Sequence, residues 1–203
     1  METPTFSEQD RDFMRQALSL AWLGRFSTSP NPRVGCVVVR GTQIVGQGFH
    51  VQAGAPHAEV HALAQAGELA RGATAYVTLE PCAHFGRTPP CAEALIRAGV
   101  SRVVAAMRDP NPQVSGKGLD LLRQAGINVQ SGLLEAEARA LNRGFLSRME
   151  RGRPFVKLKI AASLDGRTAL ADGRSKWITG EAARADVQIQ RAESCAVLTG
   201  IGT

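Results

Sequence analysis

The fold class is decided by the stretch VGCVVVRGTQIVGQGFH, residues 34–50. Its first part, Val34–Arg40, is rich in β-branched residues, which favour strands. The dipeptide Gly41-Thr42 then separates it from a second extended run, Gln43–His50. Two such runs joined by two turn residues predict a β-hairpin.

Helices and strands alternate on both sides of this hairpin. A helix is predicted before it at 7–23, where Ser7 and Asp10 resemble a capping pair and Gly24 is a stop signal. After it, apolar periodicity and Gly or Pro boundaries predict helices at 57–70, 91–98, 118–124 and 135–150 and strands at 74–79, 102–107 and 127–130. This alternation predicts an α/β fold, a three-layer α/β/α domain with a mixed sheet.

A second segment begins near Arg151-Gly152-Arg153-Pro154, which is typical of a linker. We therefore expect one domain at 1–147, followed by a linker and an incomplete domain at 148–203. Within the latter, strands are predicted at 155–160 and 195–199 and a helix at 180–192. Residues 151–203 are fewer than the ~70–80 that form a comfortable core alone, so they are interpreted as the opening of a larger α/β domain.

The composition excludes several classes of protein. With 44% hydrophobic residues the chain is globular, and no apolar run approaches the ~18 residues of a membrane span. The start, Met1–Thr5, leads into charged residues without an apolar h-region, so we expect a cytoplasmic protein with reduced cysteines. The formal charge is +6, and residues 151–203 hold nine Lys and Arg against five Asp and Glu. One Tyr and two Trp provide little aromatic interleaving, so no nucleic-acid partner is expected.

Metal-ligating residues are concentrated in two short segments, Pro56–His61 and Pro81–Cys91. These hold three of the four His and two of the four Cys. In a reduced compartment such a cluster more often binds a metal than forms a disulfide, and thiolate with imidazole suits zinc best. Two predicted helices begin at these segments, and helix N-termini favour a thiolate.

Three arrangements of the ligands compete. In the first, His57, Cys82 and Cys91 hold zinc, water takes the fourth position and Glu59 moves protons. In the second, His84 is a fourth ligand and the site is a closed structural centre.

The third arrangement joins His57 to His61 on one helix face, as in metalloproteases. It fails because Ala58 stands where those enzymes carry glutamate. The spacing of the ligands along the chain does not exclude the closed centre, but in a closed centre Glu59 would have no chemical role. Cys36 and Cys195, both in predicted strands, are interpreted as core thiols.

The pattern His57-Ala58-Glu59, then Pro81-Cys82 and Cys91, resembles the zinc-dependent nucleobase deaminase signature. It departs from that signature because eight residues, instead of two, separate the two cysteines. This long loop resembles the bifunctional diaminohydroxyphosphoribosylaminopyrimidine deaminase / 5-amino-6-(5-phosphoribosylamino)uracil reductase family of the riboflavin pathway. Three further segments resemble it too: Ser29–Cys36, Asp109–Pro112 and Ala162–Arg167. The likeness covers essentially the whole chain.

The resemblance implies a cytidine deaminase-like domain followed by the start of a dihydrofolate reductase-like α/β domain, truncated within the reductase. It implies hydrolytic deamination of 2,5-diamino-6-ribosylamino-4(3H)-pyrimidinone 5′-phosphate, with one catalytic zinc. The NADPH-dependent reductase step, and the complete NADPH site with it, is expected only in the full-length family. Phosphate groups on substrate and cofactor explain the +6 charge better than nucleic acid does. A homo-oligomer formed through the reductase region is compatible with this reading.

The resemblance also assigns individual residues. It assigns zinc binding to His57, Cys82 and Cys91 and proton transfer to Glu59. Contacts to the pyrimidine substrate fall on Asn31, His50, Arg87, Asp109 and Asn111. In the reductase part, the resemblance assigns binding of the reductase substrate to Lys159, Ser175 and Arg191. It assigns NADPH binding to Ala161, Trp177 and Thr203.

Two other functions compete with this assignment. A cytidine or tRNA-adenosine deaminase shares the core signature, but the long loop between the cysteines and Ser163–Arg167 argue against it. A non-catalytic, zinc-stabilised module is the rival of a different class. The number of protein ligands around the metal, three or four, separates an open catalytic site from a closed one.

Overall fold

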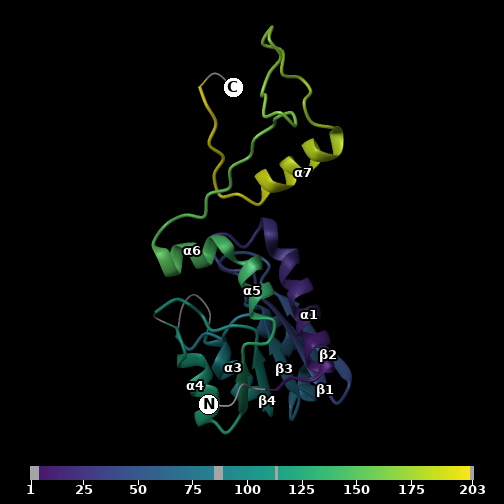
Figure 1. Ribbon diagram of the computed structural model, residues 1–203. Coiled ribbons are helices and arrows are strands. Elements are labelled where there is room, and N and C mark those ends of the chain that lie inside the picture. Colours follow the sequence, from purple (N-terminus) through teal and green to yellow (C-terminus); the bar gives the residue numbers. More distant parts are fainter. Residues whose placement is uncertain (1–4, 85–88, 113, 202–203) are drawn as a thin grey trace. The chain divides into compact units, whose positions relative to one another are not determined.

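The computed structural model describes residues 5–84, 89–112 and 114–201 (Figure 1). The chain divides into two compact units, Met1–Phe155 and Val156–Thr203. The first unit holds the predicted hairpin and the alternating elements that follow it. The predicted domain boundary at 147/148 stays a prediction.

The first unit is built on a five-stranded sheet with the order β2-β1-β3-β4-β5. The strands are β1 (Gly35–Arg40), β2 (Gln43–Phe49), β3 (Thr74–Val77), β4 (Arg102–Ala105) and β5 (Asn128–Ser131). Strand β1 pairs antiparallel with both β2 and β3, whereas β3, β4 and β5 run parallel. The predicted hairpin and mixed sheet are therefore confirmed.

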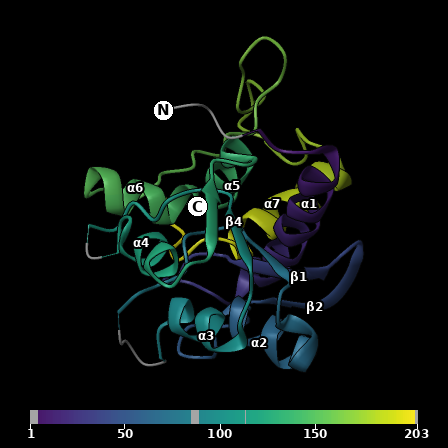
Figure 2. The ribbon, with the colours of Figure 1, turned by 90° about the horizontal axis from the view of Figure 1, so that it is seen from below.

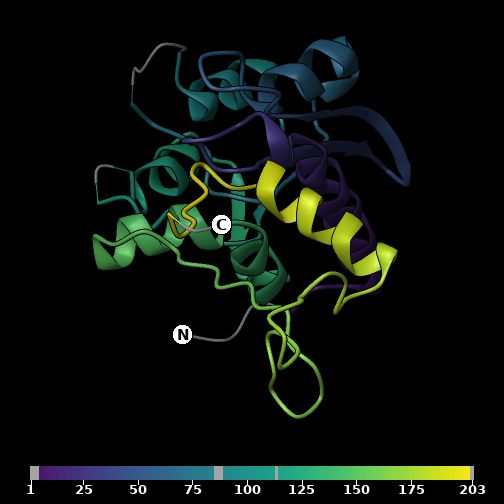
Figure 3. The same ribbon diagram turned by 90° about the horizontal axis from the view of Figure 1, so that it is seen from above.

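Helices cover both faces of this sheet. They are α1 (Glu8–Leu23), α2 (Ala58–Ala66), α3 (Cys91–Ala98), α4 (Lys117–Gln124), α5 (Glu135–Leu141) and α6 (Arg143–Arg151). Figure 2 shows α2 and α3 on one side of the sheet and α1 and α5 on the other. Figure 3 shows α2, in blue, and α6, in green, on opposite sides. The three-layer α/β/α prediction is confirmed, as is the Ser7–Asp10 capping box of α1.

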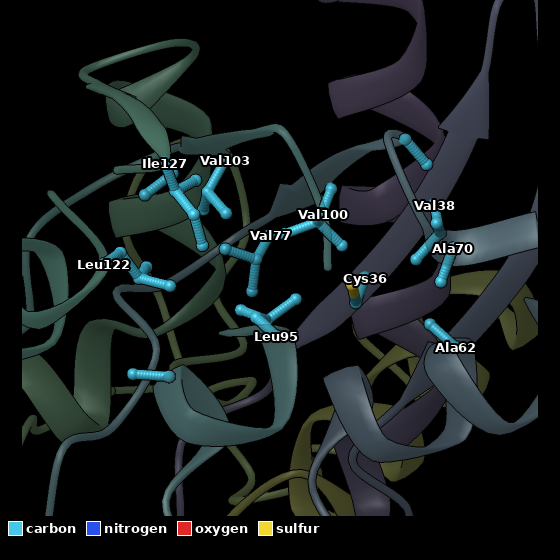
Figure 4. Packing of buried hydrophobic residues seen from close by; sticks show 14 of the residues in the cluster. Cys36, Val38, Ala62, Ala70, Val77, Leu95, Val100, Val103, Leu122 and Ile127 are labelled. Carbon is cyan, nitrogen blue, oxygen red and sulfur yellow. The ribbon is translucent and has the colours of Figure 1, made fainter. Parts of the chain in front are cut away.

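Two hydrophobic cores lie on the two faces of the sheet, because successive side chains of a strand point in opposite directions. Cys36 and Val38 belong to the core under α2, α3 and α4, which Figure 4 shows from close by. Val37 and Val39 belong to the core under α1 and α5. All four side chains are buried, so the core position predicted for Cys36 is confirmed.

Two glycines of β2 let α2 pack unusually close to the sheet. A Cβ atom at Gly46 would lie 2.0 Å from the carbonyl oxygen of Ala62, and one at Gly48 would lie 2.6 Å from that of Ala58. No side chain fits there without a shift of the backbone. This contact holds the N-terminus of α2 against the sheet, where the metal-ligating residues lie.

The predicted helix at 135–150 is wrong in one respect, because it is two helices that meet at Asn142. The Asn142 side chain accepts a hydrogen bond from the Arg33 N–H at 2.8 Å and donates one to the Arg33 carbonyl at 2.9 Å. This pairing competes with the continuous helix. The helix predicted at 57–70 is likewise shorter, since α2 ends at Ala66 and a 3₁₀ turn, Gly67–Ala70, follows.

The second unit contains the helix α7 (Glu181–Ala192), which confirms the helix predicted there. The strands predicted at 155–160 and 195–199 are wrong, because the described residues of both stretches form no ladder. An isolated extended run has no neighbour to accept its hydrogen bonds. Its apolar side chains are exposed, Val156 by 77% and Leu158 by 80%. Cys195 is also exposed, so its predicted core position is wrong.

None of the helices among the described residues is long and apolar enough to cross a membrane.

Candidate metal centre and active site

Three residues from three different segments meet at one end of the sheet. His57 is the N-cap residue of α2 and has an extended backbone, with φ −75° and ψ 166°. Cys91 is the first residue of α3, and Cys82 lies in the segment after β3. The ligand atoms of the three side chains all lie within 4.8 Å of one another. The predicted convergence of two helix N-termini is therefore present.

The atoms of this cluster suit a zinc ion. His57 Nδ1 lies 3.2 Å from Cys91 Sγ and 3.6 Å from Cys82 Sγ. The backbone N–H of Cys91 donates to Cys82 Sγ at 3.3 Å. One imidazole and two thiols form a three-ligand set, which is the number of protein ligands that catalytic zinc sites use.

Electrostatics prepare one thiol for a metal. A hydrogen bond from Cys91, assisted by His57, lowers the pKa of Cys82 to about 4 despite its burial. Cys82 is therefore a thiolate at neutral pH, which is the form that binds zinc. The hydrogen bond with Cys82 in turn raises the pKa of His57. In the same contact the hydrogen bond to Cys82 and burial raise the pKa of Cys91.

Neither of the other two histidines considered as ligands belongs to this cluster. Among the described residues, the group that could hold a metal consists of His57, Cys82 and Cys91. His84 is exposed, and His61 lies one helical turn along α2 from His57. The geometry thus favours the open arrangement over the closed one.

Glu59 lies in the first turn of α2 and is 3% exposed. Among the described residues its Oε2 is buried without a hydrogen-bond partner. Burial raises the pKa of Glu59, and its electrostatic neighbours include Cys82, His57 and Cys91. His57 and Glu59 can face the same point because His57 stands outside the helix as its N-cap residue. A buried carboxyl group with a free oxygen beside a metal cluster is suited to proton transfer.

Asn31 and His50 form a pair beside the cluster. The Asn31 amide lies 3.1 Å from His50 Nε2, and His50 Nδ1 lies 3.2 Å from the Pro56 carbonyl. The His50 ring meets the His57 ring edge to face, with 5.4 Å between their centres. Burial lowers the pKa of His50, so the ring is neutral at pH 7. The pair thus offers two neutral hydrogen-bonding groups next to the ligands.

Asp109 and Asn111 lie in the loop that follows β4. Asp109 Oδ1 accepts a hydrogen bond from the Asn111 N–H at 2.8 Å. Burial, with the nearby charge of Glu80, raises the pKa of Asp109 to about 6. The thiolate of Cys82 is also close enough to contribute to this shift. Arg87, predicted to contact the same substrate, lies outside the described residues.

The sequence interpretation missed two features of buried polar groups, namely the role of Glu80 as a hydrogen-bond acceptor and the long-range hydrogen bonds of Asp10. Glu80 is 3% exposed and accepts hydrogen bonds from several backbone N–H groups of the 109–119 region. Asp10 accepts hydrogen bonds from Tyr76 and Arg102, both at 2.7 Å. A carboxylate directly after an apolar strand, as in Thr78-Leu79-Glu80, was the available signal for the first group.

The residues predicted for the reductase lie in the second unit and in largely irregular segments. Arg191 is on α7, whereas Lys159, Ala161, Ser175 and Trp177 lie outside helices and strands. Trp177 is 70% exposed and stacks against Arg184, whose guanidinium carbon lies 4.6 Å from the ring centre. Within residues 156–201 no hydrogen bond joins any two of the five. Thr203 lies outside the described residues, and all six assignments stay predictions.

Comparison with known proteins agrees with this geometry. Residues 7–107 match the cytidine and deoxycytidylate deaminase zinc-binding region, and residues 154–203 match the RibD C-terminal domain. The riboflavin biosynthesis protein RibD of Escherichia coli is 63% identical over 195 residues, which are 96% of this chain and 53% of that protein.

Two solved structures are also similar. Acinetobacter baumannii RibD has 62% identity and a TM-score of 0.87, over 92% of this chain and 52% of that one. The diaminohydroxyphosphoribosylaminopyrimidine deaminase / 5-amino-6-(5-phosphoribosylamino)uracil reductase of Thermotoga maritima has 44% identity and a TM-score of 0.86, over 91% and 53%. The chain spans about half the length of the curated relatives it matches. It belongs to the RibD family of riboflavin biosynthesis proteins, and it covers their zinc-binding deaminase domain with a part of the C-terminal domain.

Proposed function

We propose that this chain deaminates 2,5-diamino-6-ribosylamino-4(3H)-pyrimidinone 5′-phosphate by hydrolysis, in the cytoplasm, as a step of riboflavin biosynthesis. One observation carries the proposal: a buried Glu59 with a free carboxyl oxygen lies against the cluster of His57, Cys82 and Cys91. A structural zinc module needs the cluster but has no use for such a group. The similarity to RibD proteins supports the choice of substrate.

The three ligands would hold one zinc ion, and Glu59 would carry protons. A zinc ion held by these residues would supply Lewis acidity, which would make a water molecule more acidic and stabilise negative charge on oxygen. In the overall reaction water adds at the ring carbon that bears the exocyclic amine, the C–N bond breaks, and ammonia leaves. Glu59 takes the proton from water and returns it to the departing nitrogen. Its raised pKa suits both directions, because a buried carboxyl group can hold that proton between the two steps.

The remaining residues would bind and orient the substrate. The neutral pair of Asn31 and His50 offers hydrogen bonds to the pyrimidine ring from one side. Asp109 and Asn111 offer a carboxyl and an amide group from the loop after β4. Arg87 is assigned to the same substrate, and its charge would suit the phosphate.

The second unit would belong to the reductase of the longer proteins. In that view residues 148–203 are a linker and the start of the reductase domain, and a homo-oligomer would form through the reductase region of the longer proteins. Lys159, Ser175 and Arg191 would bind its substrate, whereas Ala161, Trp177 and Thr203 would bind NADPH. We assign the complete reductase step to proteins of the full family length.

The decisive experiment measures ammonia release by the zinc-loaded 203-residue chain. The pyrimidine phosphate, cytidine and a tRNA anticodon loop that contains adenosine are compared as substrates. Only the pyrimidine phosphate should be turned over. Turnover of cytidine or tRNA in its place would establish a different deaminase, and no turnover of any substrate at full zinc occupancy would favour the zinc-stabilised module.

The Glu59→Gln variant tests the role of the carboxyl group. It should keep one zinc per chain and lose about 10²–10⁴-fold in kcat, because only the proton carrier is removed. Glu68→Gln, an identical change at an exposed residue, is the matched control and should leave kcat unchanged. Full ammonia release by Glu59→Gln would contradict the assignment.

A further inference from the structure

Glu80 is a buried carboxylate that the proposed chemistry does not use. It lies three residues after the end of β3, and it is 3% exposed. Its Oε2 accepts hydrogen bonds from the backbone N–H groups of Asp109 at 3.1 Å and Gly116 at 3.0 Å. Its Oε1 accepts from Gly118 at 3.0 Å and Leu119 at 3.4 Å. Four donors on one side chain fill the two oxygens of a carboxylate.

The two oxygens of Glu80 serve different segments. Oε2 holds both ends of the loop between β4 and α4, which includes Asp109 and Gly116. Oε1 receives N–H groups from the first turn of α4, which have no partner inside the helix. The negative charge is favourable at this helix end as well. One side chain therefore fastens a loop and a helix to the segment that follows β3.

A glycine brings α4 into direct contact with that segment. A Cβ atom at Gly118 would lie 1.8 Å from the carbonyl oxygen of Pro81, so a larger residue would push the helix away. Pro81 stands between Glu80 and the ligand Cys82. The helix start, the carboxylate and the metal-ligating segment are thus packed backbone against backbone.

The loop is built outward from its contact with Glu80. The Asp109 side chain accepts a hydrogen bond from the Asn111 N–H, and the Asn111 carbonyl accepts one from the Val114 N–H at 2.8 Å. Glu80 holds the backbone of Asp109, and the Asp109 side chain in turn holds the backbone N–H of Asn111. The side chains of both residues therefore project from a backbone that is fastened to Glu80. Both residues are among the proposed substrate contacts.

We propose that Glu80 is a positioning residue that sets the distance between the substrate-binding loop 109–111 and the metal ligand Cys82. This inference rests on the proposed function, because it assigns the loop a role in binding the pyrimidine phosphate. Glu80 is neither one of the proposed metal ligands nor one of the proposed substrate contacts. It acts through the backbone of Asp109, so its loss should weaken substrate binding far more than the chemical step.

The variant Glu80→Gln separates this role from plain stabilisation. Glutamine has the same shape but only one acceptor oxygen, so its NH₂ group must face two of the four N–H donors. We expect KM for the pyrimidine phosphate to rise about tenfold or more, kcat to change less than about threefold, and zinc content to stay at one per chain. An unchanged KM in a folded, zinc-loaded variant would overturn the proposal.

The matched control is Leu122→Ala, which weakens the same helix from its buried face. It should lower the denaturation midpoint and leave KM within about twofold of the wild-type value, because the loop keeps its acceptor. If Leu122→Ala raised KM as much as Glu80→Gln does, any loosening of α4 would suffice and Glu80 would have no specific role.

A measurement on the unchanged chain covers the case in which Glu80→Gln does not fold. Hydrogen exchange should find the amides of Asp109, Gly116 and Gly118 protected like the core strands, and exchange at free-loop rates would overturn the proposal. Glu80→Asp then replaces the glutamine variant under the same KM criterion. A wild-type chain without turnover would refute the proposed function, whereas an active wild type with a KM insensitive to residue 80 would refute this inference alone.

Discussion

The first unit, Met1–Phe155, buries most of its apolar side chains, whereas the second unit, Val156–Thr203, exposes most of its own. Val37 and Leu95 are fully buried, but Leu158 and Leu198 are 80% and 99% exposed. Both units contain apolar runs of strand length. The difference lies in the neighbours, since β1 has a paired strand on each side and the run at 155–160 has none among the described residues. Local preference makes a strand only where partners accept its hydrogen bonds.

Limited proteolysis should give the largest contrast between the units. Trypsin should cut after Lys159, in an exposed irregular segment, about 10³-fold or more faster than after Arg102, which lies in β4. Cleavage within a strand requires unfolding of the core, whereas cleavage in an open segment does not. Mass spectrometry of the early fragments measures both rates. Equal resistance of the two sites would mean that the second unit is protected by structure of its own.

A pair of leucine substitutions compares the two units by their effect on the free energy of unfolding. Leu95→Ala, at a fully buried position, should lower the free energy of unfolding by about 2–5 kcal/mol, because it loses apolar burial and leaves a cavity. Leu158→Ala, at an exposed position, should change it by less than about 0.5 kcal/mol. Urea denaturation followed by circular dichroism measures both. A comparable loss for Leu158→Ala would break the contrast.

An acid-dependent contrast comes next in size. Burial opposes ionisation of Asp10, but hydrogen bonds from Arg102, Tyr76 and Ser7 outweigh it and hold its pKa well below the usual range. A carboxyl group with a lowered folded-state pKa stabilises the fold fully above its unfolded pKa of about 3.9, and this contribution is lost progressively as the pH falls from that value through the lower folded-state pKa. Asp10→Asn should therefore cost about 1–3 kcal/mol at pH 7 and progressively less below pH 4.

The matched change in the second unit is Asp165→Asn. Asp165 pairs with Arg167, but both side chains are more than two-thirds exposed. Such pairs contribute little in water, so no change in stability is expected at either pH. Denaturation midpoints of the two variants at pH 7 and pH 3 complete the test, and a pH-independent loss for Asp10→Asn would contradict the assigned role of its charge.

The features that the sequence predicted well depend on short-range patterns. Ser7 and Asp10 are one helical turn apart, and the valines of β1 are consecutive. The ligand set was also accessible, because rare residue types cluster in two segments and a known signature contains them. The placement of helices on both faces of the sheet was predicted from the alternation of helices and strands along the chain.

The features that it missed depend on contacts between distant residues. The break at Asn142 exists because that side chain pairs with the backbone of Arg33, far away in the chain. The hydrogen bonds of Glu80 come from N–H groups about thirty to forty residues later, from Asp109 to Leu119. The strands predicted at 155–160 and 195–199 and the core position predicted for Cys195 were wrong for a different reason. Those predictions assumed neighbouring elements that the described part of the second unit does not contain.

The pairing of Asn142 with Arg33 also bears on when the site can form during synthesis. The two residues are separated by 109 positions, and Arg33 follows closely on Asn31. A chain that emerges from the ribosome in order presents the Asn31 loop long before the amide that fastens it. The metal ligands, which end at Cys91, are available for folding earlier. The loop that carries Asn31 is therefore the part of the site whose final partner is translated last.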